Sequence, residues 1–360
     1  MSLLSRSRLI CAAALAAIAG CLTAVVGCGQ SSSSPASQQH RELRLGYYPN
    51  LTHATAIIGV EKGFLAMALG PNLTLKTQTF NAGPAEVEAI FGGAIDAAYI
   101  GPNPVINAYV RSHGSLVRIV SGATSGGAGL VVRPGAGISD AASLKGKHLA
   151  TPQLGNTQDV ALRSYLAAHG MRTTVQGGGD VTITPTDNSS IVQLFKSGRI
   201  DGAWVPEPYL STLLDNAGGK LLVDEATLWP QGQFVTAELV VTTKLLNENP
   251  EVVRGLIQGD VTATDWVNSN PQEAQQVVNS ALQKLTGKPL TAKVVADAWS
   301  RLTFSEDPLA AALQRAARSA ESVGLLSNID LKGIIDVRIL NDVMRSKGRA
   351  GVSSAGLGPS

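Results

Sequence analysis

The chain has 360 residues, of which 44% are apolar, and its mean hydropathy is +0.12. This length and composition are those of a globular protein with room for two domains of ordinary size, and they exclude a disordered chain. Lys and Arg outnumber Asp and Glu by only 29 to 27. Because Arg6 and Arg8 lie in a segment predicted to be removed, the remaining chain is near neutral, and no nucleic-acid partner is expected.

The first 27 residues have the layout of an export signal. Arg6 and Arg8 give a basic start, and residues 9–27 form a nearly charge-free apolar run. This run is just long enough to cross a bilayer, so a permanent transmembrane anchor is the alternative. The block VVGC at residues 25–28 resembles the lipobox of bacterial lipoproteins, in which the cysteine is diacylated and becomes the first mature residue. We therefore expect a lipid anchor at Cys28 on the extracytoplasmic side of the cell membrane, in the periplasm or at the cell surface.

A second block of lipobox type ends at Cys21. Cleavage there would leave the apolar residues 22–27 on the mature protein, so Cys28 is preferred. The polar, Ser-rich residues that follow, up to residue 40, are predicted to be a flexible linker. All the cysteines of the chain, Cys11, Cys21 and Cys28, lie in this region. The folded body is thus predicted to have no disulfide, no cysteine nucleophile and no thiolate metal site.

From residue 41 onward, short apolar runs alternate with helix-like segments of ten to fifteen residues, which is typical of βαβ units around a mainly parallel sheet. The first set has predicted strands at 43–47, 73–80, 95–100 and 116–121 and helices at 54–69, 84–92 and 103–113. A Gly-rich passage at 126–129 separates it from a second set. That set has an apolar run at 130–132, strands at 148–150, 180–185, 200–205 and 220–223, and helices at 157–169, 190–197 and 208–217. Two such sets predict two α/β lobes.

Residues 235–242 are rich in β-branched side chains, and we interpret them as the chain crossing back to the first lobe. Two crossings between lobes make a hinge. Apolar residues at i, i+3 and i+4 then predict helices within 252–323. The predicted domains are residues 41–127 with 235–344 for lobe 1, residues 128–234 for lobe 2, and residues 345–360 as a disordered tail.

Five blocks resemble, in order, the nitrate, sulfonate and taurine group of ABC transporter substrate-binding proteins, and most closely the aliphatic-sulfonate-binding members. They are GYYPNLTHA at 46–54, FNAGP at 80–84, YIGPNP at 99–104, ATPQLGNTQD at 150–159 and DGAWVPEPY at 201–209. The resemblance implies the type II periplasmic-binding-protein fold, in which two α/β lobes are joined by two hinge strands and the solute lies between them. It also implies that ABC permease subunits are the partners, that the protein acts as a monomer, and that no cofactor is needed.

Ligands of open α/β sheets lie beyond the carboxyl ends of the strands, where loops lead into helices. Loops so placed, together with the two crossings, give the candidate ligand-binding residues Asn50, His53, Gly101, Asn103, Thr124, Asn156, Thr157, Gln158, Glu207 and Phe234. None of the strand-to-helix loops contains Arg or Lys, so an anion would have to be held by helix N-termini. The alternative for Asn103 and Thr157 is a helix-capping role, and for His53 it is packing at a helix start.

Glu207 favours a ligand with a positive end, because a carboxylate would repel a purely anionic solute in a desolvated cleft. In the taurine binders that the chain resembles, an acidic residue receives the amine, so an aminosulfonate such as taurine fits Glu207. A cationic pyrimidine of the thiamine-precursor type fits it as well. The alternative is that Glu207 makes a hydrogen bond between the lobes.

Catalysis and metal binding are not expected. The five histidines are scattered without an i, i+4 pair or an acidic cluster, so no metal site is predicted. Gly126 is one place off the G-x-S-x-G pattern around Ser125, and Gly177–Gly179 lacks the lysine of a phosphate-binding loop. The sequence thus predicts capture of a small sulfonate for an ABC importer, with a binder of nitrate, bicarbonate or a pyrimidine, or a ligand-sensing subunit of a signalling partner, as alternatives.

Overall fold

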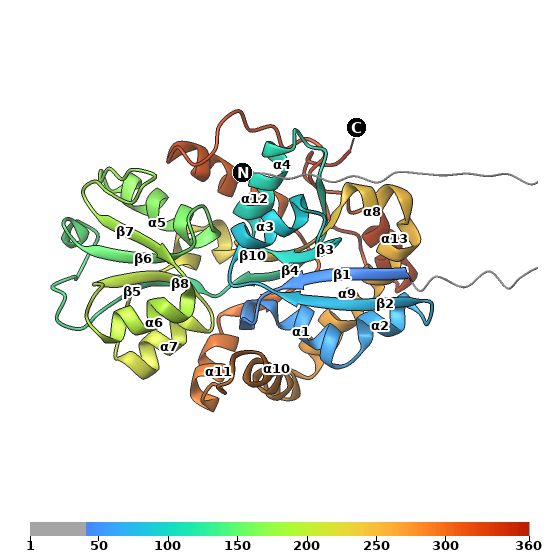
Figure 1. Cartoon of the computed structure of the whole chain (residues 1–360), viewed down its shortest axis with the longest axis horizontal. Coiled ribbons are helices and arrows are strands. Elements are labelled where there is room, and N and C mark those ends of the chain that lie inside the picture. Colours follow the sequence, from blue (N-terminus) through green and yellow to red (C-terminus); the bar gives the residue numbers. More distant parts are fainter. Residues whose placement is uncertain (1–40, 360) are drawn as a thin grey trace, which may run out of the picture. The chain divides into compact units, whose positions relative to one another are not determined.

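The computed structural model describes residues 41–359, and these form two α/β lobes (Figure 1). The predicted export signal, the candidate lipid sites Cys21 and Cys28, and the linker lie outside the described residues. Across 41–359, no helix combines the length and the apolar character that crossing a membrane requires.

Lobe 1 is built on a sheet whose described strands run in the order β11-β4-β10-β3-β1-β2. β1 pairs in parallel with β2 and β3, whereas β10 is antiparallel to both β3 and β4. Helices α1, α2 and α9 pack together, and α4 packs against α3 and α12; in Figure 1 the two groups lie on opposite sides of the sheet. The strands are β1 (Arg41–Tyr47), β2 (Leu73–Thr79), β3 (Ala97–Ile100), β4 (Val117–Gly126), β10 (Val235–Thr242) and β11 (Leu302–Phe304).

The helices of lobe 1 begin just after the strands or in the C-terminal segment. They are α1 (Ala54–Glu61), preceded by the 3-10 turn η1 (Leu51–His53), α2 (Phe64–Leu69), α3 (Gly83–Phe91), α4 (Pro102–Arg111), α8 (Thr243–Glu248), α9 (Pro250–Ser269), α10 (Pro271–Thr286), α11 (Ala292–Trp299), α12 (Ala310–Ser322) and α13 (Arg338–Ser346). Gly259 on α9 lets this helix pack close to α2, because a Cβ there would lie 2.8 Å from the Cα of Leu65.

Lobe 2 is built on a sheet in the order β7-β6-β8-β5-β9. Its apolar core has two halves: one contains Leu162 and Trp204, and the other contains Phe195 and Leu213. In Figure 1, α5 lies on one side of this sheet and α6 and α7 on the other. The elements are β5 (Ala128–Val132), β6 (His148–Pro152), α5 (Thr157–Ala168), β7 (Thr182–Thr186), α6 (Asn188–Lys196), β8 (Gly202–Pro206), α7 (Tyr209–Ala217) and β9 (Lys220–Asp224), with the 3-10 turns η2 (Ala142–Leu144), η3 (Glu225–Leu228) and η4 (Pro230–Gly232).

The chain passes between the lobes twice. It leaves the first sheet at the end of β4 and enters the second at β5, and it returns with β10, which pairs with β4 through Val235 and Ser125. Gly127 at the first crossing has a φ of 71°. A Cβ there would lie 2.3 Å from the side chain of Leu302. The positive φ favours glycine at this position, and the side chain of Leu302 would have to move to admit a Cβ.

The C-terminal segment differs from the expected disordered tail at 345–360. Its described part packs on lobe 1: the carbonyl of the buried Leu357 accepts hydrogen bonds from the N–H groups of Gly333 and Ile335, at 3.0 and 3.1 Å. Arg349 donates to both oxygens of the buried Glu306 carboxylate, at 2.9 and 2.8 Å. The Gly and Ser content misled the prediction, because these contacts join residues that are distant in sequence.

Candidate functional site

A cavity between the lobes lies where loops lead into helices. The closed lobes leave this cavity small, with a volume of about 20 Å³. Six of the ten predicted ligand-binding residues line it: Asn50, His53, Gly101, Asn156, Thr157 and Gln158. The other lining residues are Tyr48, Thr52, Asn81, Ala82, Asn188, Pro206 and Thr236. Among these described residues there is no Lys, Arg, Asp or Glu, so the wall carries no fixed charge.

Four helices start at or next to this cavity: α3 after Ala82, α4 after Gly101, α5 after Asn156 and α6 after Asp187. In the described structure none of these four N-cap residues accepts a side-chain hydrogen bond from its helix. The first N–H groups of a helix have no partner within the helix, and the aligned peptide dipoles place partial positive charge there. The cavity wall is therefore suited to an anion without any basic side chain.

Some polar atoms in the wall are buried without a protein partner in hydrogen-bonding geometry. Among the described residues that line the cavity, these are Oγ1 of Thr157 and Oδ1 of Asn188. An unpaired buried polar group costs about 1–3 kcal/mol. A solute that pairs with these atoms recovers this free energy, so they are expected to be contact points.

His53 is a neutral donor in this wall. Its side chain is buried, and the burial lowers its pKa to about 3. Its Nδ1 accepts a hydrogen bond from the N–H of Tyr48 at 3.2 Å, so the ring proton is on Nε2. The imidazole can thus offer an N–H to an anion without carrying a charge.

A buried carboxyl group lies behind Tyr48. Glu86 on α3 is fully buried, and this burial raises its pKa well above the usual value. Burial, and then the proximity of Glu86, raise the pKa of Tyr48 well above its usual value. The neutral acid and the neutral phenol are favoured together, so this pair adds no negative charge that would repel an anion in the cavity.

Glu207, which was predicted to receive the amine of a ligand, does not line this cavity. Its carboxylate accepts hydrogen bonds from the N–H and Oγ of Ser211, at 3.0 and 2.8 Å. It also pairs with Arg301 of lobe 1 at 3.3 Å. The physical reason is that α7 begins two residues after Glu207, so the carboxylate satisfies the start of that helix. The alternative given above, a bond between the lobes, is what the structure contains.

Three other predicted residues also lie outside this cavity wall. Nδ2 of Asn103 donates to the carbonyl of Ala316 at 3.1 Å, and Asn103 lines a neighbouring cavity instead. Thr124 is buried within β4. The ring of Phe234 stacks on Trp229 with 5.9 Å between centroids. Neither Thr124 nor Phe234 lines the cavity.

Two asparagines of the cavity wall, Asn81 and Asn188, were missed by sequence reasoning. Their position in loops between the carboxyl end of a strand and the start of a helix could have identified them, as it did the other candidate residues. Asn81 follows β2, and Asn188 follows β7 and starts α6, so both lie at carboxyl ends of strands where helices begin.

Direct contacts between the lobes close the cavity. Oε1 of Gln153 accepts a hydrogen bond from the N–H of Ala85 at the start of α3, at 3.3 Å. Lys293 of α11 pairs with Asp215 of α7 at 2.6 Å. A Cβ on Gly101 would lie 2.6 Å from Oγ1 of Thr157, so these residues of opposite lobes are in contact. The lobes are therefore in a closed arrangement.

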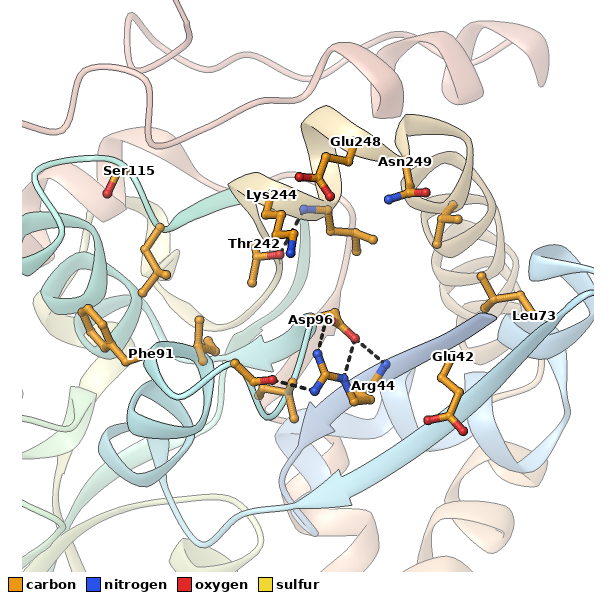
Figure 2. Close-up of a pocket in the computed structure, with 16 residues that line it drawn as sticks. Glu42, Arg44, Leu73, Phe91, Asp96, Ser115, Thr242, Lys244, Glu248 and Asn249 are labelled. Atoms are coloured by element: carbon orange, nitrogen blue, oxygen red, sulfur yellow. Dashed lines mark hydrogen bonds and ion pairs between the residues drawn. The ribbon is translucent and has the colours of Figure 1, made fainter. Parts of the chain in front are cut away.

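A larger hollow lies at the opposite end of the first sheet, near the beginning of β1 (Figure 2). Its most prominent cation is Arg44, whose guanidinium donates to both oxygens of Asp96 at 2.9 and 2.6 Å. This ion pair neutralises Arg44, and the remaining charged lining residues are Lys244, Glu42 and Glu248, so carboxylates outnumber cations in the lining. The hollow lies at the amino ends of β1 and β2. Through 41–359, no group of three or more His, Cys, Asp and Glu residues could hold a metal ion.

The chain was compared with known proteins. A binding protein of Brucella abortus (strain 2308) is 29% identical over 244 residues, which are 67% of this chain and 72% of the relative. A Bacillus subtilis (strain 168) protein named as an aliphatic sulfonates-binding protein is 24% identical over 336 residues, 91% of this chain and 95% of the relative. The alkanesulfonate-binding protein SsuA from Xanthomonas axonopodis pv. citri, bound to MOPS, has a TM-score of 0.66 at 20% identity, over 80% of this chain and 94% of that one.

These findings confirm the expected fold of two α/β lobes of the periplasmic-binding-protein type. They place the chain among solute-binding proteins and not among enzymes. Residues 36–282, more than half of the chain, match one family along their whole length. The chain therefore belongs to the NMT1-like family.

Proposed function

We propose that this chain is the extracytoplasmic solute-binding lipoprotein of an ABC importer and that it captures a small organic sulfonate. The observation that carries the proposal is the uncharged cavity between the lobes, with four helix starts that lack side-chain caps. Relatives and structural neighbours named as sulfonate-binding proteins support the choice of anion.

The cavity favours an anion over a cationic pyrimidine. A cation buried between the lobes would need a carboxylate in the wall, and among the described lining residues there is none. A sulfonate instead offers three oxygens to donors that approach from several directions. Helix starts in both lobes and the Nε2–H of His53 provide such donors.

The mechanism that we propose is closure of the lobes on the solute. Helix starts of lobe 1 and of lobe 2 contribute to the same cavity, so a bound anion interacts with both lobes only when they are closed. A ligand shifts the equilibrium toward the state for which it has the higher affinity. The closed, loaded protein is then the form that the permease subunits recognise.

Calorimetric titration of the purified protein tests the anion class. We expect micromolar binding of propanesulfonate, about −8 kcal/mol, and much weaker binding of nitrate and bicarbonate. Tighter binding of nitrate or bicarbonate would contradict the sulfonate assignment but not the binding function. A pyrimidine that binds while every anion fails would overturn both the ligand class and the role of the helix starts.

The transport role and the anchor need separate measurements. In vesicles with the permease and ATPase subunits, loaded protein should stimulate ATP hydrolysis. Failure there, together with ligand-dependent activation of a sensor kinase, would favour the signalling alternative. Labelled palmitate should be incorporated into the wild type and into a Cys21→Ser variant but not into a Cys28→Ser variant, and the opposite pattern would place the lipid on Cys21.

A further inference from the structure

A hollow on the surface of the protein is walled by both lobes. It has a volume of about 580 Å³. Lobe 2 contributes Trp229 and residues of the turn η4, and lobe 1 contributes residues of α12 together with Ser353 and Ala355 of the C-terminal segment. A change in the arrangement of the lobes would therefore change the shape of this hollow.

The hollow is open to solvent. Most of the residues that line it are exposed, in contrast to the buried residues around the cavity between the lobes. Sites for small molecules are concave and bury most of the surface of the ligand. An exposed hollow of this size suits a segment of another macromolecule instead.

The lining of the hollow has an excess of positive charge. Arg315 and Arg318 are exposed and lie three residues apart on α12, so their side chains are neighbours. Asp307 is the one acidic residue among the described lining residues, and its Oδ1 accepts a hydrogen bond from the N–H of Leu309 at 2.9 Å. Within residues 41–359, neither arginine forms an ion pair with a carboxylate. The two guanidinium groups are thus available to carboxylates of a partner.

One contact in the hollow joins the lobes. The guanidinium of Arg315 lies over the ring of Trp229, 4.9 Å from its centroid. Trp229 belongs to the segment through which lobe 2 leads into β10, and Arg315 belongs to lobe 1. The face of an indole attracts a cation, so this contact holds Arg315 in place while the lobes are closed. Opening of the lobes would separate the two residues.

Two strained backbone positions also line the hollow, one from each lobe. Gln231 has a φ of 56° and Leu309 has a φ of 47°. Residues other than glycine rarely adopt this left-handed conformation. Such positions are destabilising, persist only where the surrounding structure holds them, and are concentrated at functional sites. The cavity between the lobes does not account for them, because neither residue lines it.

We propose that this hollow is a docking surface for the permease and that it receives an acidic segment whose carboxylates pair with Arg315 and Arg318. The inference rests on the proposed function, which makes the permease subunits the partner and the closed protein the form that they recognise. Opposite charge on the partner accelerates association, and arginine pairs strongly with carboxylates. Because both lobes wall the hollow, the surface is complete only in the closed protein.

The test measures how much protein the transporter needs. Vesicles with the permease and ATPase subunits receive protein loaded with propanesulfonate, and the concentration that gives half-maximal stimulation of ATP hydrolysis is determined. We expect the double variant Arg315→Glu/Arg318→Glu to need at least about tenfold more protein than the wild type. Its affinity for propanesulfonate in calorimetry should be unchanged, because neither arginine lines the cavity between the lobes. The difference should shrink as salt is raised from about 50 to about 300 mM, since salt screens exposed charges.

The matched control is the double variant Lys196→Glu/Arg199→Glu. It also reverses two exposed cations three residues apart, and both lie outside the lining of the hollow. It should leave the half-maximal concentration at the wild-type value. Arg318→Glu alone keeps the contact between Arg315 and Trp229 and should still raise that concentration by about threefold. This variant separates the effect of charge from any displacement of Trp229.

Three outcomes would contradict the proposals, and they can be told apart. Equal half-maximal concentrations for the wild type and the Arg315/Arg318 variant, or an equal rise in both double variants, would overturn the docking surface. Normal stimulation by the Arg315/Arg318 variant, with weaker binding to permease-free vesicles of anionic but not of neutral phospholipid, would assign the hollow to the lipid surface instead. If the wild type gives no stimulation at any concentration, the proposed import function itself fails.

Discussion

Gly101 of lobe 1 and Thr157 of lobe 2 meet so closely that a Cβ on Gly101 would lie 2.6 Å from the Thr157 hydroxyl. The backbone of Gly101 has a φ of −74° and a ψ of 159°, which any residue adopts. Glycine is therefore required here for closure of the lobes, and not for the fold of the loop.

A Gly101→Ala variant should lose affinity for the ligand and keep its stability. The added methyl group opposes closure, and overpacking of this kind costs about 1–3 kcal/mol, so affinity should fall by at least about tenfold. Calorimetry and thermal unfolding of the ligand-free protein measure the two effects. Gly178→Ala is the control, because a Cβ there meets only the Thr174 hydroxyl at 3.5 Å. Unchanged affinity in Gly101→Ala would contradict the closed state as the binding state.

Thr157→Val should separate binding from stability. The valine keeps the shape of the side chain and removes a buried hydroxyl that has no protein partner. Ligand affinity should therefore fall by about 1 kcal/mol, while the ligand-free protein should unfold at the same or a higher temperature. Thr157→Ser, which keeps the hydroxyl, should retain more affinity than Thr157→Val. A fall in stability with no change in affinity would assign the hydroxyl to the fold instead of the ligand.

The pH dependence of stability should contain a contribution from Glu207. Burial raises its pKa from 4.5 to about 7, against the opposing effects of Ser211 and Arg301. The folded state therefore binds the proton more tightly than the unfolded state. The stability from this group is fully present below pH 4.5 and is lost as pH rises to about 7.

Glu207→Gln removes this titration. Between pH 4.5 and 7 the unfolding free energy of the variant should rise relative to the wild type by roughly 3 kcal/mol. Urea unfolding across this pH range measures the difference, with the exposed Glu88→Gln as the control. Parallel curves for wild type and Glu207→Gln would show that the Arg301 pair keeps the carboxylate ionised throughout.

The C-terminal segment should contribute to stability through Arg349. Arg349→Ala leaves the buried Glu306 carboxylate without its cation, and because Arg349 is itself partly exposed we expect a loss of about 1–2 kcal/mol in urea unfolding. Arg345→Ala, which removes an exposed pair with Asp342, should change stability by less than about 0.5 kcal/mol. Equally small losses of unfolding free energy in the two variants would mean that the Arg349–Glu306 contact of the C-terminal segment does not stabilise the fold.

The fold and most of the cavity wall could be predicted because they depend on local patterns. Alternating strand and helix patterns gave two α/β sets, and loops after strands gave Gly101 and the group from Asn156 to Gln158. The contacts of Glu207 could not be predicted, because a carboxylate two residues before a helix can either face a ligand or accept hydrogen bonds from the start of that helix. Its bonds to Ser211 and Arg301 depend on the tertiary structure.

The remaining features depend on contacts between distant residues. Asn103 lies outside the cavity wall because its amide is bound to the carbonyl of Ala316, which is 213 residues away in the sequence. The tail was misassigned for the same reason, since nothing near Leu357 in the sequence indicates its bonds to Gly333 and Ile335. Periodicity and composition carry no information on such pairs.

The helix starts around the first cavity also determine what mutagenesis can detect. Their donors are main-chain N–H groups, so replacing any of the neighbouring residues with alanine leaves the donors in place. An alanine scan of this wall would report only the side-chain contribution to the binding free energy. It would therefore underestimate the total contribution of the wall to binding. Replacement of single peptide bonds by esters would remove individual donors and measure the part that an alanine scan misses.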